Sequence, residues 1–448
     1  MTESPASAVS SDQPPGPGRR RFGRAVQRLL IDVGPLRRSP DFRRLVLGQI
    51  VSVLGTQLTA VAAPYQVYEL TRSSLDVGLM SLAQLVPLAA GSLIGGVVAD
   101  AVDRRRLLIA TQVLLGACSA GLALNADLGP ALWPLYAVPA VAAGLAGFDD
   151  AALTSLVPRL VQRSEVSTAN AVLQALFQFG GVAGPAAAGL LLAGAGVRFV
   201  YWLDAASFAA ALLAALLIAP QPPAGGAVRP DLRSLADGFR FVRRSPVLQG
   251  AYLIDVNAMV FGEPRALFPA LAATVFGGGA STLGFLYAAP GAGALVGAVT
   301  TGWVGRVRRQ GRAVLIAVVV WGLAIAAFGL VSWLPAALVL LAVAGWADVI
   351  SAVFRNTMVQ LSVPDAMQGR LTGVQLTVVS VGPRLGDVES GAVAAAIGTG
   401  ASIVSGGLAC VAGAFVLARL LPEFRRQRAE PDAPAPAALD APTPEAAG

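Results

Sequence analysis

Residues 96–106 read GVVADAVDRRR, a short polar stretch that lies between two apolar segments. Each flanking segment is long enough to cross a bilayer, since about 20 mainly apolar residues suffice. The stretch contains a glycine, an acid four residues later and a basic cluster: Gly96, Asp100, Arg104, Arg105 and Arg106. We therefore expect a cytoplasmic loop that joins two membrane helices and acts as a conformational hinge.

The composition places the whole chain in a membrane. Its 448 residues are 55% hydrophobic and only 13% charged, which is too apolar for a soluble protein of several domains. All 33 basic residues are arginine, and histidine is absent. A P-loop needs lysine, and zinc sites or general bases need histidines or paired cysteines, whereas Cys118 and Cys410 lie far apart. We expect neither a metal nor an organic cofactor.

Twelve segments are long and apolar enough to be membrane spans, and they fall into two groups of six. The expected spans are 43–67, 75–98, 107–125, 132–157, 166–194 and 199–219, then 247–273, 281–303, 313–332, 336–361, 371–397 and 401–421. The expected organisation is a cytoplasmic disordered tail (1–35), a six-helix bundle (36–219), a cytoplasmic linker (220–245), a second six-helix bundle (246–422) and a second disordered tail (423–448). The predicted fold class is an all-α integral membrane protein with two pseudo-symmetric bundles.

The arginines predict the orientation of these spans. If the amino terminus is cytoplasmic, 28 of the 33 arginines lie on the cytoplasmic tails and connections. Because basic residues favour the cytoplasmic side, we expect a multi-pass protein of the cytoplasmic membrane with both termini inside. The basic face suits anionic lipid headgroups rather than nucleic acid, and no obligate protein partner is evident.

The two halves of the chain repeat with an offset of 206 residues. The tetrapeptide at 37–40, Arg-Arg-Ser-Pro, recurs at 243–246. The other repeated positions are Gly78 and Gly284, Gly96 and Gly302, Arg106 and Arg312, and Val157-Pro158 and Val363-Pro364. Asp100 does not recur, because Arg306 takes its place. A parallel repeat of six spans predicts a site at the midplane between the halves.

The stretch at 96–106 resembles the loop between helices 2 and 3 of the major facilitator superfamily. Asp103 stands where that family usually has glycine, and Ala101 where it often has arginine. The resemblance implies twelve helices in two bundles that rock about a central site, with small residues of the loop allowing close helix approach and the acid meeting a neighbouring helix end. A basic loop that merely obeys the orientation rule would show the same charges.

The expected span 166–194 carries a second pattern, GGVAGPAAAG at 180–189. It resembles the fifth-helix motif of antiporters in this superfamily, through Gly180, Gly184, Pro185 and Gly189, with Ala188 where a glycine is usual. Small residues four apart make a flat face for close packing, and Pro185 removes a backbone donor and favours a kink. Ordinary tight helix packing is the alternative explanation.

Several runs in the second half resemble the enterobactin exporter branch of the superfamily. They are GFRFVRRSPVLQG from residue 238, RALFPALA at 265–272, LGFLYAAPGAGALVGAVTTGW at 283–303 and TMVQLSVPDAMQGRLTGV at 357–374. The resemblance implies a secondary transporter without enzymatic activity, which uses the proton gradient to export a siderophore or similar bulky polar small molecule. Related branches export macrolides and other drugs, so drug efflux stays an alternative.

Ionisable residues within the expected spans are candidates for the transport site, because such groups are costly in a membrane unless they are paired or hydrated. In the second half they are Asp255, Glu263, Arg265, Asp348, Arg355, Arg384, Asp387 and Glu389, with Asp149 and Asp150 as first-half counterparts. Arg384 and Asp387 share a helix face and are expected to pair. Mutual neutralisation that holds helices together is the alternative role for any of these residues.

We assign two functions within this set. Arg384 and Arg265 are expected to bind an anionic cargo, since an arginine fork suits catecholate or carboxylate oxygens. Asp348 and Asp255 are the first candidates for carrying a proton, followed by Asp387 and Glu389, while Glu263 is expected nearer the outer surface. A polytopic enzyme, a receptor and an uptake carrier remain competing functions, and the identity of the cargo is not predicted.

Overall fold

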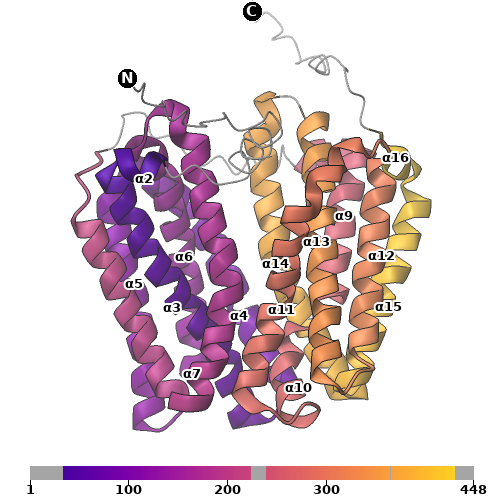
Figure 1. Cartoon of the computed structure of the whole chain (residues 1–448), viewed down its shortest axis with the longest axis horizontal. Helices are drawn as coiled ribbons and strands as arrows, with labels where there is room; N and C mark the ends of the chain where they lie inside the picture. The colour runs from indigo at the N-terminus through magenta and orange to yellow at the C-terminus, as the bar shows by residue number, and fades with distance from the viewer. Residues whose placement is uncertain (1–33, 223–238, 364, 429–448) are drawn as a thin grey trace, which may run out of the picture.

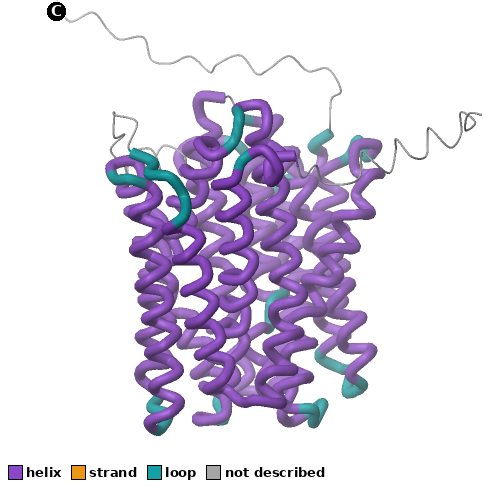
Figure 2. The backbone as a smooth tube through the Cα atoms, turned by 60° about the vertical axis from the view of Figure 1, so that its left-hand side comes forward, coloured by secondary structure: helices purple, strands orange, loops and turns teal. Residues whose placement is uncertain are grey.

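The computed structural model describes residues 34–222, 239–363 and 365–428. Within these ranges all regular secondary structure is helical. The expected tails 1–35 and 423–448 and the linker 220–245 lie mostly outside the described residues. Long helices run nearly parallel, with most of the connecting loops at the two ends (Figure 2).

The helices of the first half form a bundle on the left of Figure 1. They are α2 (Gly34–Arg38), α3 (Pro40–Thr71), α4 (Ser74–Ala101), α5 (Arg104–Leu128), α6 (Leu132–Leu160), η1 (Arg163–Glu165) and α7 (Val166–Leu216). The elements of the second half are α9 (Pro246–Phe261), η2 (Arg265–Leu267), α10 (Phe268–Thr274), α11 (Gly279–Thr300), η3 (Thr301–Arg306), α12 (Gln310–Phe328), α13 (Leu334–Ser362), α14 (Asp365–Ile397), α15 (Thr399–Leu420) and α16 (Pro422–Arg426).

Helix α7 contains two membrane passes. Its 51 residues would extend over about 75 Å if straight, far more than a hydrocarbon core of about 30 Å. Gly196 interrupts it with φ 80 and ψ 173, a conformation that glycine adopts without steric penalty. The expected spans 166–194 and 199–219 are therefore the two legs of α7.

The expected span 247–273 is wrong as a single helix. Helix α9 ends at Phe261, and the chain continues through Gly262, Glu263 and Pro264 into η2 and α10. Pro264 cannot donate a backbone hydrogen bond and disfavours helical geometry at the residue before it, which explains the break. The Trp321 indole donates to the Gly262 carbonyl oxygen at 2.9 Å and satisfies one of the freed backbone groups.

The remaining spans agree with expectation. Nine helices of the described chain are long and apolar enough to cross a membrane by length and composition, and one of these includes both legs of α7. The broken α9–α10 segment and the charge-bearing α14 fall outside that criterion. The described ends α2 and α16 lie on the same side of the bundle (Figure 1), as an even number of crossings requires.

The internal repeat appears as a repeated helix cap. Ser39 caps α3 by accepting from the Phe42 amide at 3.1 Å, and Ser245 caps α9 by accepting from the Leu248 amide at 3.4 Å. The two serines also have nearly the same backbone angles, −109 and 107 against −112 and 106. A proline follows each serine, where its missing donor costs nothing.

Candidate functional site

A cavity of about 810 Å³ lies between the two halves. Its first-half wall comes from α3, α4, α5, α6 and α7, and its second-half wall from η2, α11, α13 and α14. On α3 the lining runs from Gln49 to Pro64, so it reaches well towards the end of the bundle that carries α2. This is the volume expected for a site that holds a sizeable small molecule.

Close backbone contacts between the halves lie at the opposite end. A Cβ on Gly391 of α14 would be 2.7 Å from the Ser74 carbonyl oxygen, where α4 begins. A Cβ on Gly189 of α7 would be 2.7 Å from the Ala280 carbonyl oxygen, where α11 begins. Ser74 and Ala280 are 206 residues apart, so the repeat supplies matched contacts that join the halves at this end.

The first-half wall carries carboxylates with polar neighbours. Asp149 of α6 accepts hydrogen bonds from Thr111 Oγ1 at 2.5 Å and from Gln112 Nε2 at 2.9 Å. Asp150 lines the cavity beside it. Asp204, in the second leg of α7, also lines the cavity, and its side-chain partners among the described residues are hydroxyl groups.

The second-half wall carries two arginines. Arg265 lies in η2, where the break after α9 brings it to the cavity, and its Nε is 2.6 Å from Glu263 Oε1. Arg384 of α14 lines the cavity and donates from Nη1 to the Ser380 carbonyl oxygen at 2.8 Å. Its buried Nε has no hydrogen-bond partner within the described structure. Both guanidinium groups therefore retain donors for a bound anion.

Two acids complete this wall. Asp348 of α13 lines the cavity. Asp387 of α14 also lines it, and accepts from the Ala266 amide at 3.1 Å. No ion pair joins Asp387 to Arg384 in the described structure, so the expected pairing of these two neighbours is wrong.

Three candidates lie outside the cavity. Asp255 of α9 forms a buried ion pair with Arg355 of α13, which holds these two helices together. Glu263 pairs with Arg265 from behind the wall, and Glu389 is absent from the cavity lining. The structure thus brings Arg265, Asp348, Arg384 and Asp387 to the cavity, while Glu263 reaches it only through its ion pair with Arg265.

Acids outnumber arginines around the cavity. Among the described lining residues there are five carboxylates, Asp149, Asp150, Asp204, Asp348 and Asp387, and two guanidinium groups, Arg265 and Arg384. An ionised carboxylate in a membrane interior needs a compensating cation or proton. The cavity is therefore suited to bind protons or cationic groups in addition to an anion.

The loop at 96–106 is attached to the start of the connection between the halves. Asp103 caps α5 by accepting from the Arg105 amide at 2.9 Å, and both its oxygens lie 3.2 Å from the Gln221 amide. Arg105 donates to the Leu216 carbonyl oxygen at 2.6 Å, at the end of α7. The Asp100 side chain is about half exposed, and its carboxylate is 3.6 Å from the Arg104 guanidinium. Asp103 rather than Asp100 is thus the acid of this loop that contacts the segment following α7.

The close helix approach expected at Gly96 occurs one residue earlier. A Cβ on Gly95 would be 2.8 Å from the Gly147 carbonyl oxygen of α6, whereas one on Gly96 would meet no atom within 4 Å. Gly96 points away from this contact, because successive residues of a helix point in directions about 100° apart.

The glycines of the 180–189 pattern face two different neighbours. Gly180 and Gly184 pack against Val53 and Gln57 of α3, within the first half. The Pro185 carbonyl oxygen and Gly189 instead approach Gly284 of α11, in the second half. One helix face thus supports the bundle, and the other forms the contact between the halves.

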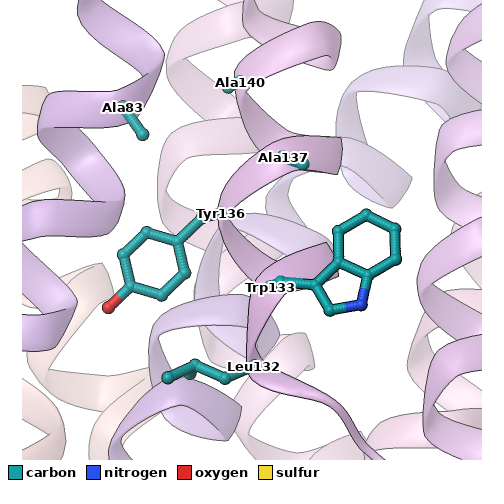
Figure 3. A pocket seen from close by; sticks show the side chains of 6 residues that line it. All are labelled: Ala83, Leu132, Trp133, Tyr136, Ala137 and Ala140. Carbon is teal, nitrogen blue, oxygen red and sulfur yellow. The ribbon is translucent and has the colours of Figure 1, made fainter.

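A second hollow of about 610 Å³ lies on the surface between α4 and α6 (Figure 3). Its lining is almost entirely apolar: Ala83, Leu132, Trp133, Tyr136, Ala137 and Ala140. Its polar side-chain groups are the Tyr136 hydroxyl, which is 3.1 Å from the Asp76 carbonyl oxygen, and the Trp133 indole N–H. Neither carries a charge for a polar cargo, and the central cavity remains the candidate site.

The sequence reasoning missed two residues. Asp204 is an acid within the expected span 199–219, and the rule applied to the other intramembrane charges would have found it. Asp103 was treated only as a departure from a pattern, although an acid directly before a helix is a capping signal.

Comparison with known proteins agrees with this architecture. Residues 32–445 match the family model described as "Transmembrane secretion effector". The chain is 32% identical over 406 residues to the enterobactin exporter EntS of Escherichia coli O139:H28 and of Escherichia fergusonii, covering 90% of this chain and 97% of each relative.

Solved structures share the fold. A bacterial homologue of the lysosomal transporter Spinster, in an inward-facing and unoccupied conformation, has a TM-score of 0.70 at 15% identity, over 90% of this chain and all of that one. A POT family transporter in complex with 5-aminolevulinic acid also has a TM-score of 0.70, at 12% identity over 86% of this chain and 97% of that one.

The fold and the cavity between its halves define a multi-pass membrane protein that acts as a secondary transporter and not as an enzyme. The chain belongs to the transmembrane secretion effector family of the major facilitator superfamily.

Proposed function

We propose that this transporter exports a siderophore or a similar bulky polar metabolite across the cytoplasmic membrane, driven by the proton gradient. The central cavity supports this proposal, because Arg265 and Arg384 present guanidinium groups to a space of about 810 Å³. Guanidinium forks bind paired oxygens of the catecholate or carboxylate type. The similarity to enterobactin exporters supports the same class of cargo.

The contacts between the halves support an alternating-access cycle for this proposal. In this conformation the ends around Ser74 and Ala280 are joined, and the cavity lining extends towards the end that carries α2. With α2 on the cytoplasmic face, cargo enters from the cytoplasm. Separation of the α4–α14 and α7–α11 contacts then releases it outside, and the reverse movement resets the carrier.

The test is deletion of the gene in its own host under iron starvation. We expect siderophore to accumulate in the cells and to decrease in the medium, and a plasmid copy to reverse both changes. Unchanged distribution in the deletion strain would contradict siderophore export.

Drug efflux is a second candidate, favoured by the five carboxylates of the cavity wall. Most macrolides and many other exported drugs carry a basic amine, which these acids would attract. Purified protein in vesicles separates the two functions. Enterobactin accumulation that a macrolide does not inhibit supports siderophore export, and the opposite result supports drug efflux.

A further inference from the structure

Asp204 is a buried acid whose side-chain partners are hydroxyl groups from three helix segments. Thr59 of α3 donates to its Oδ2 at 2.5 Å and Ser119 of α5 donates to the same oxygen at 2.7 Å. Ser207, one turn further along α7, lies 3.4 Å from Oδ1. The residue is only 1% exposed, yet Asp204, Thr59 and Ser119 all line the central cavity.

No arginine approaches this carboxylate in the described structure. On the α3 side Gly55 faces it, and a Cβ there would be 2.7 Å from Asp204 Oδ1. The titratable neighbours are Tyr201, whose hydroxyl donates to Gln66 at 2.9 Å, and Cys118, adjacent to Ser119. Asp149 of α6 also lines the cavity but has its own partners on α5.

Three other acids each have at least one partner that can only donate. Asp255 faces the guanidinium of Arg355. Asp149 accepts from the amide of Gln112 as well as from the Thr111 hydroxyl, and Asp387 accepts from a backbone N–H as well as from the Ser81 hydroxyl. Such N–H groups stabilise the ionised carboxylate and offer nothing to a carboxylic acid proton. A hydroxyl group both donates and accepts, so the partners of Asp204 can serve either form.

We propose that Asp204 is a reversible proton-binding site on the first-half wall, separate from the arginines of the second-half wall. A proton from cavity water forms an O–H bond on the carboxylate. The Thr59 or Ser119 hydroxyl then rotates so that its oxygen accepts from the new acid group. Loss of the proton to cavity water reverses both changes.

Proton binding at Asp204 does not depend on the proposed function. Only the coupling of that proton to cargo movement rests on it. Proton and anionic cargo then occupy opposite walls and need not compete for one group. Protonation removes an uncompensated charge from between α3, α5 and α7, and so alters the cost of desolvating that wall when the halves move.

The first test needs no cargo. Protein with ¹³C-labelled aspartate carboxyl groups is placed in lipid vesicles, and infrared difference spectra are recorded from acidic to alkaline pH. We expect a protonated carboxyl band that disappears as pH rises, is absent in Asp204→Asn and is retained in Asp127→Asn, a control carboxylate that binds Trp202 and Arg198 at the surface. An unchanged band in Asp204→Asn overturns the proposal.

A second variant keeps the carboxyl group and guards against misfolding. Ser119→Ala removes one hydroxyl partner, so the band should remain while its titration midpoint moves. A midpoint equal to that of the wild type would contradict the part assigned to the hydroxyl groups. The amide bands of the same spectra report whether each variant retains its helices.

The second test uses enterobactin and a pH gradient in vesicles. Asp204→Asn should lose gradient-driven accumulation while cargo exchange without a gradient persists, because the neutral side chain resembles the protonated state. Loss of both activities in a folded variant indicates a structural role and overturns the proposal. If the wild type ignores the gradient, the proposed function fails, whereas the infrared result still decides whether Asp204 binds a proton.

Discussion

The two walls of the central cavity come from copies of one six-helix unit and differ in chemistry. Among the described lining residues, the first-half wall has three carboxylates and no arginine, while the second-half wall has two arginines beside two carboxylates. The repeat offset of 206 aligns Arg265 with Thr59, and Arg384 with Gln178. The same positions thus hold cationic groups in one half and neutral polar groups in the other.

Between the two halves, equivalent positions that cap or pack helices differ less than equivalent positions that face the cavity. Ser39 and Ser245 cap equivalent helices, and Gly78 and Gly284 lie against the opposite half at matched places. A cap or a close contact is required in both copies because both bundles need it to fold and close. Cavity positions are free to diverge, and their divergence gives the two walls separate tasks.

The largest effect is expected on stability, from replacement of Arg355, which pairs with Asp255 in the second half. Arg355→Met leaves the Asp255 carboxylate buried without its partner, and removal of one member of a buried pair costs about 3–5 kcal/mol. Thermal unfolding in detergent should show a strong loss of stability. The double variant Asp255→Asn with Arg355→Met should recover part of it, and an unstable double variant would contradict this account.

Arg384 is expected to affect binding rather than stability. Arg384→Ala removes charge-assisted hydrogen bonds worth about 1.5–3 kcal/mol, so enterobactin should bind about 10- to 100-fold more weakly by calorimetry. Arg72→Ala is the control, because that arginine pairs with Glu69 at the surface. Wild-type affinity in Arg384→Ala would remove this residue from the cargo site.

The contact between the halves is tested at Gly284. A Cβ there would lie 2.6 Å from the Gly189 Cα atom, so Gly284→Val should separate α7 from α11 at a cost of about 1–3 kcal/mol. Cysteine labelling should find the end opposite α2 open more often, and transport should fall. The same change at Gly302, which has no atom within 4 Å of its Cβ position, should leave both unaffected.

The smallest effect is expected at the loop. Asp103→Ala removes a helix cap worth about 1 kcal/mol and frees the Gln221 amide. Turnover in vesicles should fall a few-fold with cargo affinity retained, because the change affects the exchange between conformations. Asp100→Ala, which removes only an exposed contact, should have less effect. Equal loss in the two variants would argue against the role given to Asp103.

Much of this architecture was predictable from the sequence, because bilayer thickness imposes span length and the repeat relates the halves. The sequence Gly262-Glu263-Pro264 indicates a break after α9, but the apolar residues on both sides make the segment resemble one continuous span. The site was predictable only in part. Asp255 and Arg355 lie 100 residues apart, and the hydropathy pattern cannot predict that they form an ion pair. Which acids face the cavity depends on helix rotation, which needs the packed structure.

Movement of the halves about the cavity is the central claim, and a distance measurement tests it most directly. Spin labels are placed at Leu128 and Val275, exposed positions of the two halves at the end of the bundle opposite α2. Their distance is measured by pulsed electron resonance in vesicles after Cys118 and Cys410 are replaced by serine. We predict one short distance without cargo, and an added longer population when enterobactin and a pH gradient are present. A single distance that ignores both would contradict alternating access.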